Sequence, residues 1–281
     1  MISLHQFKNG SYTLKDGEGD QLMHSSIGAA IEAERLYGIP GREHLKSLSM
    51  NANGCATVWD VGFGTGSNAI ALFDAFMIAE KEHDTDEPIQ KLSIESFELF
   101  PETLSVTLEN IQQFPALLPY QINLVDLLEH GKSTGVVGPH QIPFEWRLIF
   151  GDFRETIQNG NPPNLVFYDF YSPKSNSALW DTTVFQSIHE KTRIFDENFS
   201  FKLLTYSSAT WVRAHLLAAG FYIGEGTTTE LKNETTEATL NYESLSKPVS
   251  RQWKEKLFLS ASPEMNDEIR KKASEHPQWN T

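Results

Sequence analysis

The sequence predicts an α/β fold in which a mostly parallel sheet of seven strands is covered by helices on both faces. Three observations support this fold class. Strand-like and helix-like segments alternate along the 281 residues, a glycine-rich turn joins a buried strand to a helix, and four strands in succession end in an acidic residue. Alternation of this kind produces parallel strands joined by right-handed helical crossovers. The chain is long enough to bury a sizeable core.

The glycine-rich turn follows the strand at 57–61 and leads into a helix through Gly62-Phe63-Gly64-Thr65-Gly66-Ser67-Asn68. Glycine permits a sharp bend and close approach of a ligand, and the amides of the following helix favour an anionic or polar guest. A dinucleotide fingerprint needs G-x-G-x-x-G, but position 67 is Ser, and the Lys of a P-loop is absent. An acid, Asp60, followed by Gly-x-Gly-x-Gly resembles S-adenosylmethionine (SAM)-dependent methyltransferases. A tight turn without a ligand is the alternative.

The remaining elements are expected in order along the chain. Residues 1–22 form short extended pieces with turns at Asn9-Gly10 and Asp16-Gly17, and a helix over 25–37 starts at a Ser25 or Ser26 cap. Later helices are expected at 103–114, at 210–219 with a Ser207 or Ser208 cap, and at 266–274. The later strands are expected at 92–98, 146–150, 164–169, 201–206, 221–226 and 237–241, with the last two as an antiparallel edge pair.

The domain organisation follows from these elements. Residues 1–54 form an N-terminal extension that packs over the cofactor site, and 55–243 form the catalytic domain. Residues 115–145 are an insertion containing a hairpin, and 244–281 are a polar tail. We expect a run of charged residues, 80–88, to be a solvated loop.

Composition excludes several classes of function. A net charge of −14 argues against a broadly basic surface that coats nucleic acid, although a local basic patch remains possible. The single cysteine, Cys55, excludes an internal disulfide and a cysteine-based zinc site, and the nine His have no metal-ligand spacing. The first 15 residues are polar, and no apolar helix is long enough to cross a bilayer. A cytoplasmic protein without a metal or membrane partner is expected.

Four acids end successive strands: Asp60, Glu98, Asp152 and Asp169. The carboxyl ends of parallel strands meet at one edge, so these acids should converge on one crevice. SAM offers two ribose hydroxyls, an adenine amino group and an ammonium group. We therefore assign Glu98 to the ribose, Asp152 to the adenine with Phe153 beside the ring, and Asp60 to the turn or the methionine end. Taken singly, each acid could instead cap a helix.

Asp169 is the expected reaction centre. Methyl transfer to an amine requires a nitrogen lone pair aligned with the methyl group and an acceptor for the N–H proton. Asp169 precedes Phe170, Tyr171 and Pro173, so the segment offers a carboxylate next to ring faces for a flat substrate. The alternative is that Asp169 caps a turn while the aromatic rings pack in the core.

Several segments in collinear order resemble the methyltransferase domain of MnmC. They are Gly62 to Asn68, Ser96-Phe97-Glu98-Leu99-Phe100-Pro101, Phe150-Gly151-Asp152, Asp169 to Trp180, Thr205-Tyr206-Ser207-Ser208-Ala209 to Arg213, and Ala219-Gly220-Phe221. The likeness runs from about residue 11 to 226. It leaves no room for the flavin oxidase domain of MnmC, so the chain is similar to the stand-alone form, MnmD.

The resemblance implies a class I SAM-methyltransferase fold and methylation of the aminomethyl group on the wobble uridine of tRNA, giving 5-methylaminomethyluridine. It implies a cofactor site built from Asp60, Gly62, Phe63, Gly64, Thr65, Gly66, Asn68, Glu98, Asp152 and Phe153. It places the substrate against Phe170, Tyr171, Pro173, Lys174, Ser207 and Arg213, with Asp169 as the catalytic residue. A separate oxidase is a possible partner.

Two departures from the family leave other functions open. Where the family has a basic segment after the position of Gly226, this chain has Thr227 to Glu234 with one Lys, and Phe170 replaces a small residue. Phosphate contacts would then fall to Lys174, Arg213, Arg251, Lys254, Lys256 and Arg270-Lys271-Lys272, each of which is by default a solvated surface charge. The alternatives are methylation of another amine, in a small molecule or a protein, and a non-catalytic SAM-binding subunit of an oxidase.

Overall fold

The computed structural model describes residues 2–16, 21–23, 28–48, 54–78, 89–193, 199–228 and 233–281. The expected Ser25 or Ser26 cap and the expected charged loop at 80–88 lie outside these ranges.

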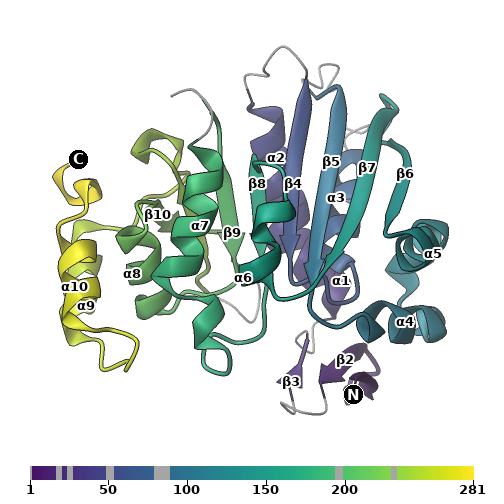
Figure 1. Ribbon diagram of the computed structural model, residues 1–281, viewed down its shortest axis with the longest axis horizontal. Helices are drawn as coiled ribbons and strands as arrows, with labels where there is room; N and C mark the ends of the chain where they lie inside the picture. The colour runs from purple at the N-terminus through teal and green to yellow at the C-terminus, as the bar shows by residue number, and fades with distance from the viewer. Residues whose placement is uncertain are drawn as a thin grey trace.

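The main sheet has eight strands in the order β10-β11-β9-β8-β4-β5-β7-β6 (Figure 1). The strands that pair in parallel are β4 (Cys55–Val61), β5 (Lys91–Glu98), β7 (Ile142–Phe150), β8 (Leu165–Tyr168) and β9 (Lys202–Thr205). Antiparallel strands complete both edges: β6 (Lys132–Val137), β10 (Tyr222–Glu225) and β11 (Thr236–Thr239). The predicted mostly parallel α/β sheet is confirmed, with one strand more than the seven expected.

The strand order reverses beside β4. From β4 the chain continues to β5 and β7 on one side, and it then returns to β8 and β9 on the other. Open α/β sheets bind ligands at such a switch point, outside the carboxyl ends of the strands.

Alternate residues of the central strands supply two separate cores, because successive strand side chains point to opposite faces. Val58 and Phe167 belong to one core, and Trp59 and Val166 belong to the other. The first core is covered by α1 (Ala29–Ala33), the π-helix η1 (Glu34–Gly38), α2 (Ile39–Lys46), α3 (Ser67–Ile78), α4 (Glu102–Glu109) and α5 (Gln121–His130). The second is covered by α6 (Phe153–Thr156), α7 (Thr182–Thr192) and α8 (Thr210–Ala218).

The segment 115–145, predicted as an insertion, is partly helical. A 3-10 helix, η4 (Pro115–Tyr120), leads into α5, which ends at Gly131 with a φ of 70°. β6 then pairs with the first half of β7 as a hairpin, as expected, and supplies the additional strand. Helix α8 differs from its expectation in one detail: its N-cap position is Ala209, while the Ser207 hydroxyl accepts from the Ala209 amide at 3.4 Å.

The first strands stand apart from the main sheet. β1 (Ile2–Gln6), β2 (Tyr12–Asp16) and β3 (Gln21–Leu22) form a three-stranded antiparallel sheet with a turn at Gly10, as expected. In Figure 1 this small sheet lies beyond the carboxyl ends of the parallel strands.

The C-terminal residues pack as part of the second core. Helices α9 (Glu255–Leu259) and α10 (Asp267–Ser274) lie at one end of the molecule, opposite α4 and α5 (Figure 1). The α10 helix begins where expected, because the Asn266 side chain accepts from the Ile269 amide at 2.9 Å. Trp253 and Trp279 stack with ring centroids 6.2 Å apart, and both are buried.

Trp279→Ala should therefore lower the free energy of unfolding by about 3–5 kcal/mol, because it leaves a cavity and removes the indole hydrogen bond to the Ala273 carbonyl. The matched control is Phe258→Ala, whose ring is 62% exposed and should cost less than about 0.5 kcal/mol. Urea denaturation of both variants makes the comparison. Equal small losses would show that the C-terminal segment is an independent appendage.

Candidate functional site

The glycine turn joins β4 to α3 beneath the carboxyl edge of the sheet. Gly62, Gly64 and Gly66 have φ values of 94°, 57° and 81°, a region that non-glycine residues rarely adopt. The amides of Gly62 and Phe63 donate to the Phe97 carbonyl at 3.1 and 3.0 Å, which ties the turn to the end of β5.

Gly62 also meets the end of β8. A Cβ at this position would lie 2.6 Å from the Asp169 carbonyl oxygen. Only glycine therefore allows the β4 turn and the segment after β8 to approach each other this closely.

Glu98 lies at the end of β5 and is almost fully buried. Its two carboxylate oxygens accept from the Gly64 amide at 3.1 Å and the Phe100 amide at 3.0 Å. Burial raises the pKa of Glu98 above its ordinary value. Each carboxylate oxygen has a further lone pair, so the two oxygens can still accept from a pair of ligand hydroxyls.

Asp60 and Asp169 are bridged by one amide. Asn68 Nδ2 donates to Asp169 Oδ2 at 2.9 Å and lies 3.5 Å from Asp60 Oδ1. The Ser96 hydroxyl donates to the other Asp60 oxygen at 2.8 Å. Burial raises the pKa of Asp60 to about 8, and the nearby Asp169 charge adds to the increase. Asp60 is therefore mostly protonated at neutral pH, whereas Asp169 is only half-buried.

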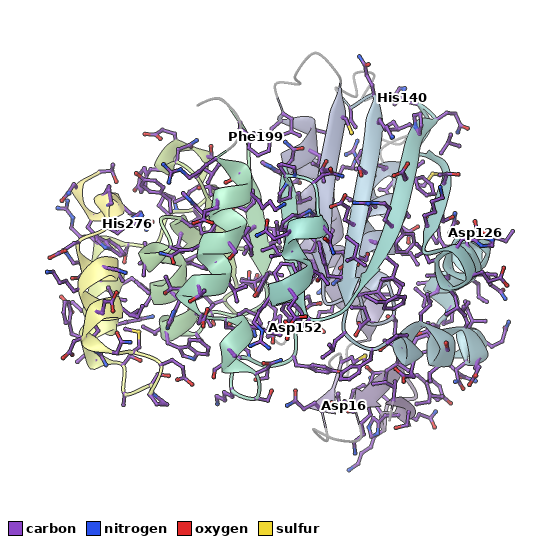
Figure 2. All side chains as sticks on the ribbon, viewed as in Figure 1. Asp16, Asp126, His140, Asp152, Phe199 and His276 are labelled. Atoms are coloured by element: carbon purple, nitrogen blue, oxygen red, sulfur yellow. The ribbon has the colours of Figure 1, made fainter. Side chains whose placement is uncertain are left out.

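The carboxyl ends of β4, β5 and β8 surround a cavity of about 230 Å³. Its lining includes six residues that the sequence assigned to the site: Gly62, Gly64, Glu98, Asp169, Phe170 and Tyr171. The small N-terminal sheet contributes Asp16, Gln21 and Met23 to the same cavity. Figure 2 shows Asp16 and Asp152 at the same end of the molecule, opposite His140.

Asp152 and Phe153 do not line this cavity. Asp152 caps α6 by accepting from the Arg154 amide at 2.9 Å and also forms an ion pair with the Arg154 guanidinium, which lowers the Asp152 pKa. Phe153 is buried, and its ring packs edge-on against Phe97 and Phe170 at 5.0 and 5.6 Å. Phe153 thus supports the cavity wall from behind.

The other residues assigned to the turn face inward. Phe63, Thr65 and Gly66 are buried, and the Thr65 and Ser67 hydroxyls are 2.6 Å apart. On the substrate side, Pro173 is buried and Lys174 is exposed.

Arg213 and Ser207 connect α8 and the turn before it to β11, and neither lines the cavity. The buried Arg213 guanidinium donates to the Thr236 hydroxyl at 2.9 Å and the Thr235 carbonyl at 2.7 Å, and it pairs with Glu234. Ser207 lies in the turn before α8, where its carbonyl accepts from Thr236. The structure thus gives Arg213 a role in joining α8 to β11 instead of the expected phosphate contact.

Sequence reasoning missed two tyrosines near Asp169, Tyr37 and Tyr206, and a third residue, Glu32, that acts on both. Burial first, and the Asp169 charge second, raise the pKa values of Tyr37 and Tyr206, and the charge of the buried Glu32 acts on both. The Tyr206 hydroxyl donates to the Phe170 carbonyl at 3.0 Å. The sequence did place these residues on predicted elements: Glu32 and Tyr37 lie on the predicted amphipathic helix, and Tyr206 ends a predicted strand. Their position over Asp169 depends on tertiary packing.

The described part of the chain also lacks two kinds of feature. Within it, no group of three or more His, Cys, Asp or Glu side chains is arranged to hold a metal ion. None of the helices in these ranges combines the length and apolar character needed to cross a bilayer.

Gly62→Ala should disrupt the site more than its backbone strain alone explains. Gly10 is the matched control, because its φ of 86° is similarly unfavourable for Ala while no atom lies within 4 Å of its Cβ position. Gly10→Ala should cost about 1–2 kcal/mol and leave binding of S-adenosylhomocysteine (SAH) intact. Gly62→Ala should cost more than about 2 kcal/mol and lose most SAH affinity, because the strand ends must separate. Calorimetry measures the SAH affinity of both variants, and urea denaturation measures their unfolding free energies. Equal SAH affinities would contradict the steric argument.

Asp60→Asn should change how stability depends on pH. The folded pKa of Asp60 is raised from 3.8 to about 8. The retained proton therefore contributes stability that is fully present below about pH 4 and is lost as pH rises through about pH 8. Asn cannot ionise, so the unfolding free energy of the variant relative to wild type should increase from pH 5 to pH 9. A constant difference across urea denaturation curves in this range would contradict the raised pKa.

Comparisons with known proteins agree with this site. A family model described as S-adenosyl-L-methionine-dependent methyltransferase matches residues 133–241. The "tRNA 5-methylaminomethyl-2-thiouridine biosynthesis bifunctional protein MnmC" of Burkholderia mallei (strain SAVP1) is 28% identical over 211 residues. The protein of the same name from Burkholderia pseudomallei (strain 668) matches equally well. The match covers 71% of this chain but only 30% of the length of either relative.

A solved structure covers the whole fold. The crystal structure of MNMC2 from Aquifex aeolicus aligns with 100% of this chain and 85% of its own, at 23% identity and a TM-score of 0.64. The MNMC2 match supports the fold, and the family model and MnmC relatives support the chemistry. The glycine turn, the Glu98 and Asp169 carboxylates and these likenesses together identify the chain as an S-adenosyl-L-methionine-dependent methyltransferase similar to the methyltransferase part of MnmC.

Proposed function

We propose that this methyltransferase acts on the primary amine of an aminomethyl group at the wobble uridine of tRNA, giving 5-methylaminomethyluridine or its 2-thio form. The likeness to MnmC proteins named for biosynthesis of this nucleoside supports the proposal. The matched region spans only 30% of their length. A tRNA substrate would place the protein in the cytoplasm.

The observation that carries the proposal is the setting of Asp169. Its carboxylate lies on the cavity wall, is oriented by Asn68 at 2.9 Å, and is followed directly by the aromatic rings of Phe170 and Tyr171. A carboxylate beside aromatic faces suits a flat base that carries an amine. Asp60 is unsuited to the same role because it is fully buried and mostly protonated.

The residues present also fit SAM. Glu98 is fixed by two backbone amides and retains lone pairs for the ribose hydroxyls. When bound, SAM supplies an electrophilic methyl group, whose bond to sulfur breaks as the amine lone pair forms the N–CH3 bond, leaving the bonding electrons on sulfur.

Asp169 contributes to this transfer through the amine protons. An aliphatic amine arrives largely as an ammonium ion, and its lone pair becomes available when a proton passes to the Asp169 carboxylate. The neutral carboxyl group that results can accept a remaining N–H through its carbonyl oxygen and so direct the lone pair. Aromatic side chains around the cavity exclude water from the reacting atoms.

The test is methyl transfer from labelled SAM to bulk tRNA taken from a strain that lacks the modification. Label should appear in 5-methylaminomethyluridine. At saturating SAM, Asp169→Asn should reduce turnover at least about 100-fold, because Asn can still accept from Asn68 but cannot take a proton. Unchanged turnover in the variant would remove Asp169 from the reaction. SAH binding without label in any nucleoside would remove tRNA as the substrate.

One observation favours a second candidate, methylation of a small amine. The residues that line the described cavity include carboxylates but no Lys or Arg. Of the expected phosphate contacts, Arg213 is buried, Arg251 and Arg270 donate to backbone carbonyls, and Lys272 pairs with Glu268. The segment after Gly226, in which one Lys stands with two Glu, falls partly outside the described residues. Transfer of label to a small amine, with none to tRNA, would establish this alternative.

A further inference from the structure

Two buried polar atoms beside Asp169 make no hydrogen bond of ordinary geometry. They are the Tyr37 hydroxyl and the Asn68 side-chain oxygen, on side chains that are 1% and 2% exposed. A buried polar atom without a partner costs about 1–3 kcal/mol, so such atoms are rare in folded proteins. Two of them next to one carboxylate indicate that something absent from the free protein completes this part of the site.

The Tyr37 hydroxyl cannot easily turn away from Asp169. The ring lies in η1 and packs against Phe167 at a centroid distance of 5.3 Å. The next residue, Gly38, is so close to α3 that a Cβ there would lie 2.4 Å from the Ala71 carbonyl. Burial first, then the Asp169 charge and a hydrogen-bonding interaction with the Asp169 side chain, raise the Tyr37 pKa. The hydroxyl therefore stays neutral with its proton toward Asp169, and its oxygen can still accept a hydrogen bond.

The orientation of Asn68 is equally fixed. Its Nδ2 faces the oxygens of Asp169 and Asp60 at 2.9 and 3.5 Å. Rotating the amide would bring its oxygen against the Asp169 carboxylate, which has no proton to donate when ionised. The unpartnered Oδ1 is therefore an acceptor held in place beside Asp169.

We propose that Tyr37 and Asn68 hold the primary amino group of a bound ligand against Asp169. A primary ammonium group has three N–H donors. The region around Asp169 offers three acceptors: the Asp169 carboxylate, Asn68 Oδ1 and the Tyr37 oxygen. A hydroxyl or a tertiary amine has at most one such donor and leaves two acceptors unmet. The fit therefore selects a primary amine.

Two amino groups meet this description. One is the α-amino group in the methionine part of SAM, and the other is the acceptor amine. The second source rests on the proposed function, whereas the first requires only that SAM binds. Either source makes Tyr37 a binding residue that the sequence motifs did not include.

The experiment compares wild-type protein with Tyr37→Phe by calorimetry. Three ligands are titrated: SAH, 5′-methylthioadenosine, which lacks the amino-acid part, and 5-aminomethyluridine added to SAH-saturated protein. If the SAM amine is bound, Tyr37→Phe should weaken SAH about tenfold and leave 5′-methylthioadenosine unchanged. If the acceptor amine is bound, only 5-aminomethyluridine should weaken about tenfold.

A structural role for Tyr37 gives a different pattern. Because the hydroxyl makes no hydrogen bond of ordinary geometry in the free protein, Tyr37→Phe should lower the melting temperature without ligand by less than Tyr120→Phe does. Tyr120→Phe is the matched control, since it removes a hydroxyl that donates to Asp74 at 2.6 Å, and it should lower the melting temperature and leave ligand binding unchanged. The proposal is overturned if Tyr37→Phe weakens neither SAH nor 5-aminomethyluridine. These titrations measure binding and need no turnover on tRNA. Failure of the Tyr37 proposal can therefore be distinguished from failure of the proposed function.

Discussion

The architecture of the site depends on holding carboxylates together at the ends of adjacent parallel strands. Asp60, Glu98 and Asp169 would repel one another if all were charged and free. The fold limits this repulsion in three ways: Asn68 donates between Asp60 and Asp169, burial keeps Asp60 largely protonated, and backbone amides of the glycine turn and of Phe100 bind Glu98. Asp169 is left as the carboxylate that is both oriented and open to the cavity.

The glycine turn fixes the positions of these strand ends through backbone contacts. Its first residue brings β4 against the segment after β8, and its amides bind the end of β5. The position of Asp169 relative to Glu98 is thus set by backbone contacts within the sheet, which are more rigid than a loop would provide. A reaction that depends on aligning an amine with a methyl group benefits from this rigidity.

Sequence reasoning succeeded where geometry is local or imposed by the sheet. The glycine spacing and the acids at strand ends located Gly62, Glu98 and Asp169, because parallel strands necessarily bring their carboxyl ends together. It could not foresee that Asp152 would bind its neighbour Arg154, or that Arg213 would be enclosed between α8 and β11. It also missed Tyr37, because η1 reaches Asp169 only through packing on α3.

The N-terminal segments complete a cavity whose other walls come from the ends of β4, β5 and β8, so the wall near Asp16 belongs to a part of the chain distant in sequence from the others. The residues that line the cavity run from Asp16 to Leu179 in the sequence, and long-range closure of this kind carries an entropic cost. A ligand that touches both walls acts as a non-covalent crosslink between the start of the chain and the sheet. Ligand affinity and the anchoring of the first strands are thereby thermodynamically linked, and each strengthens the other.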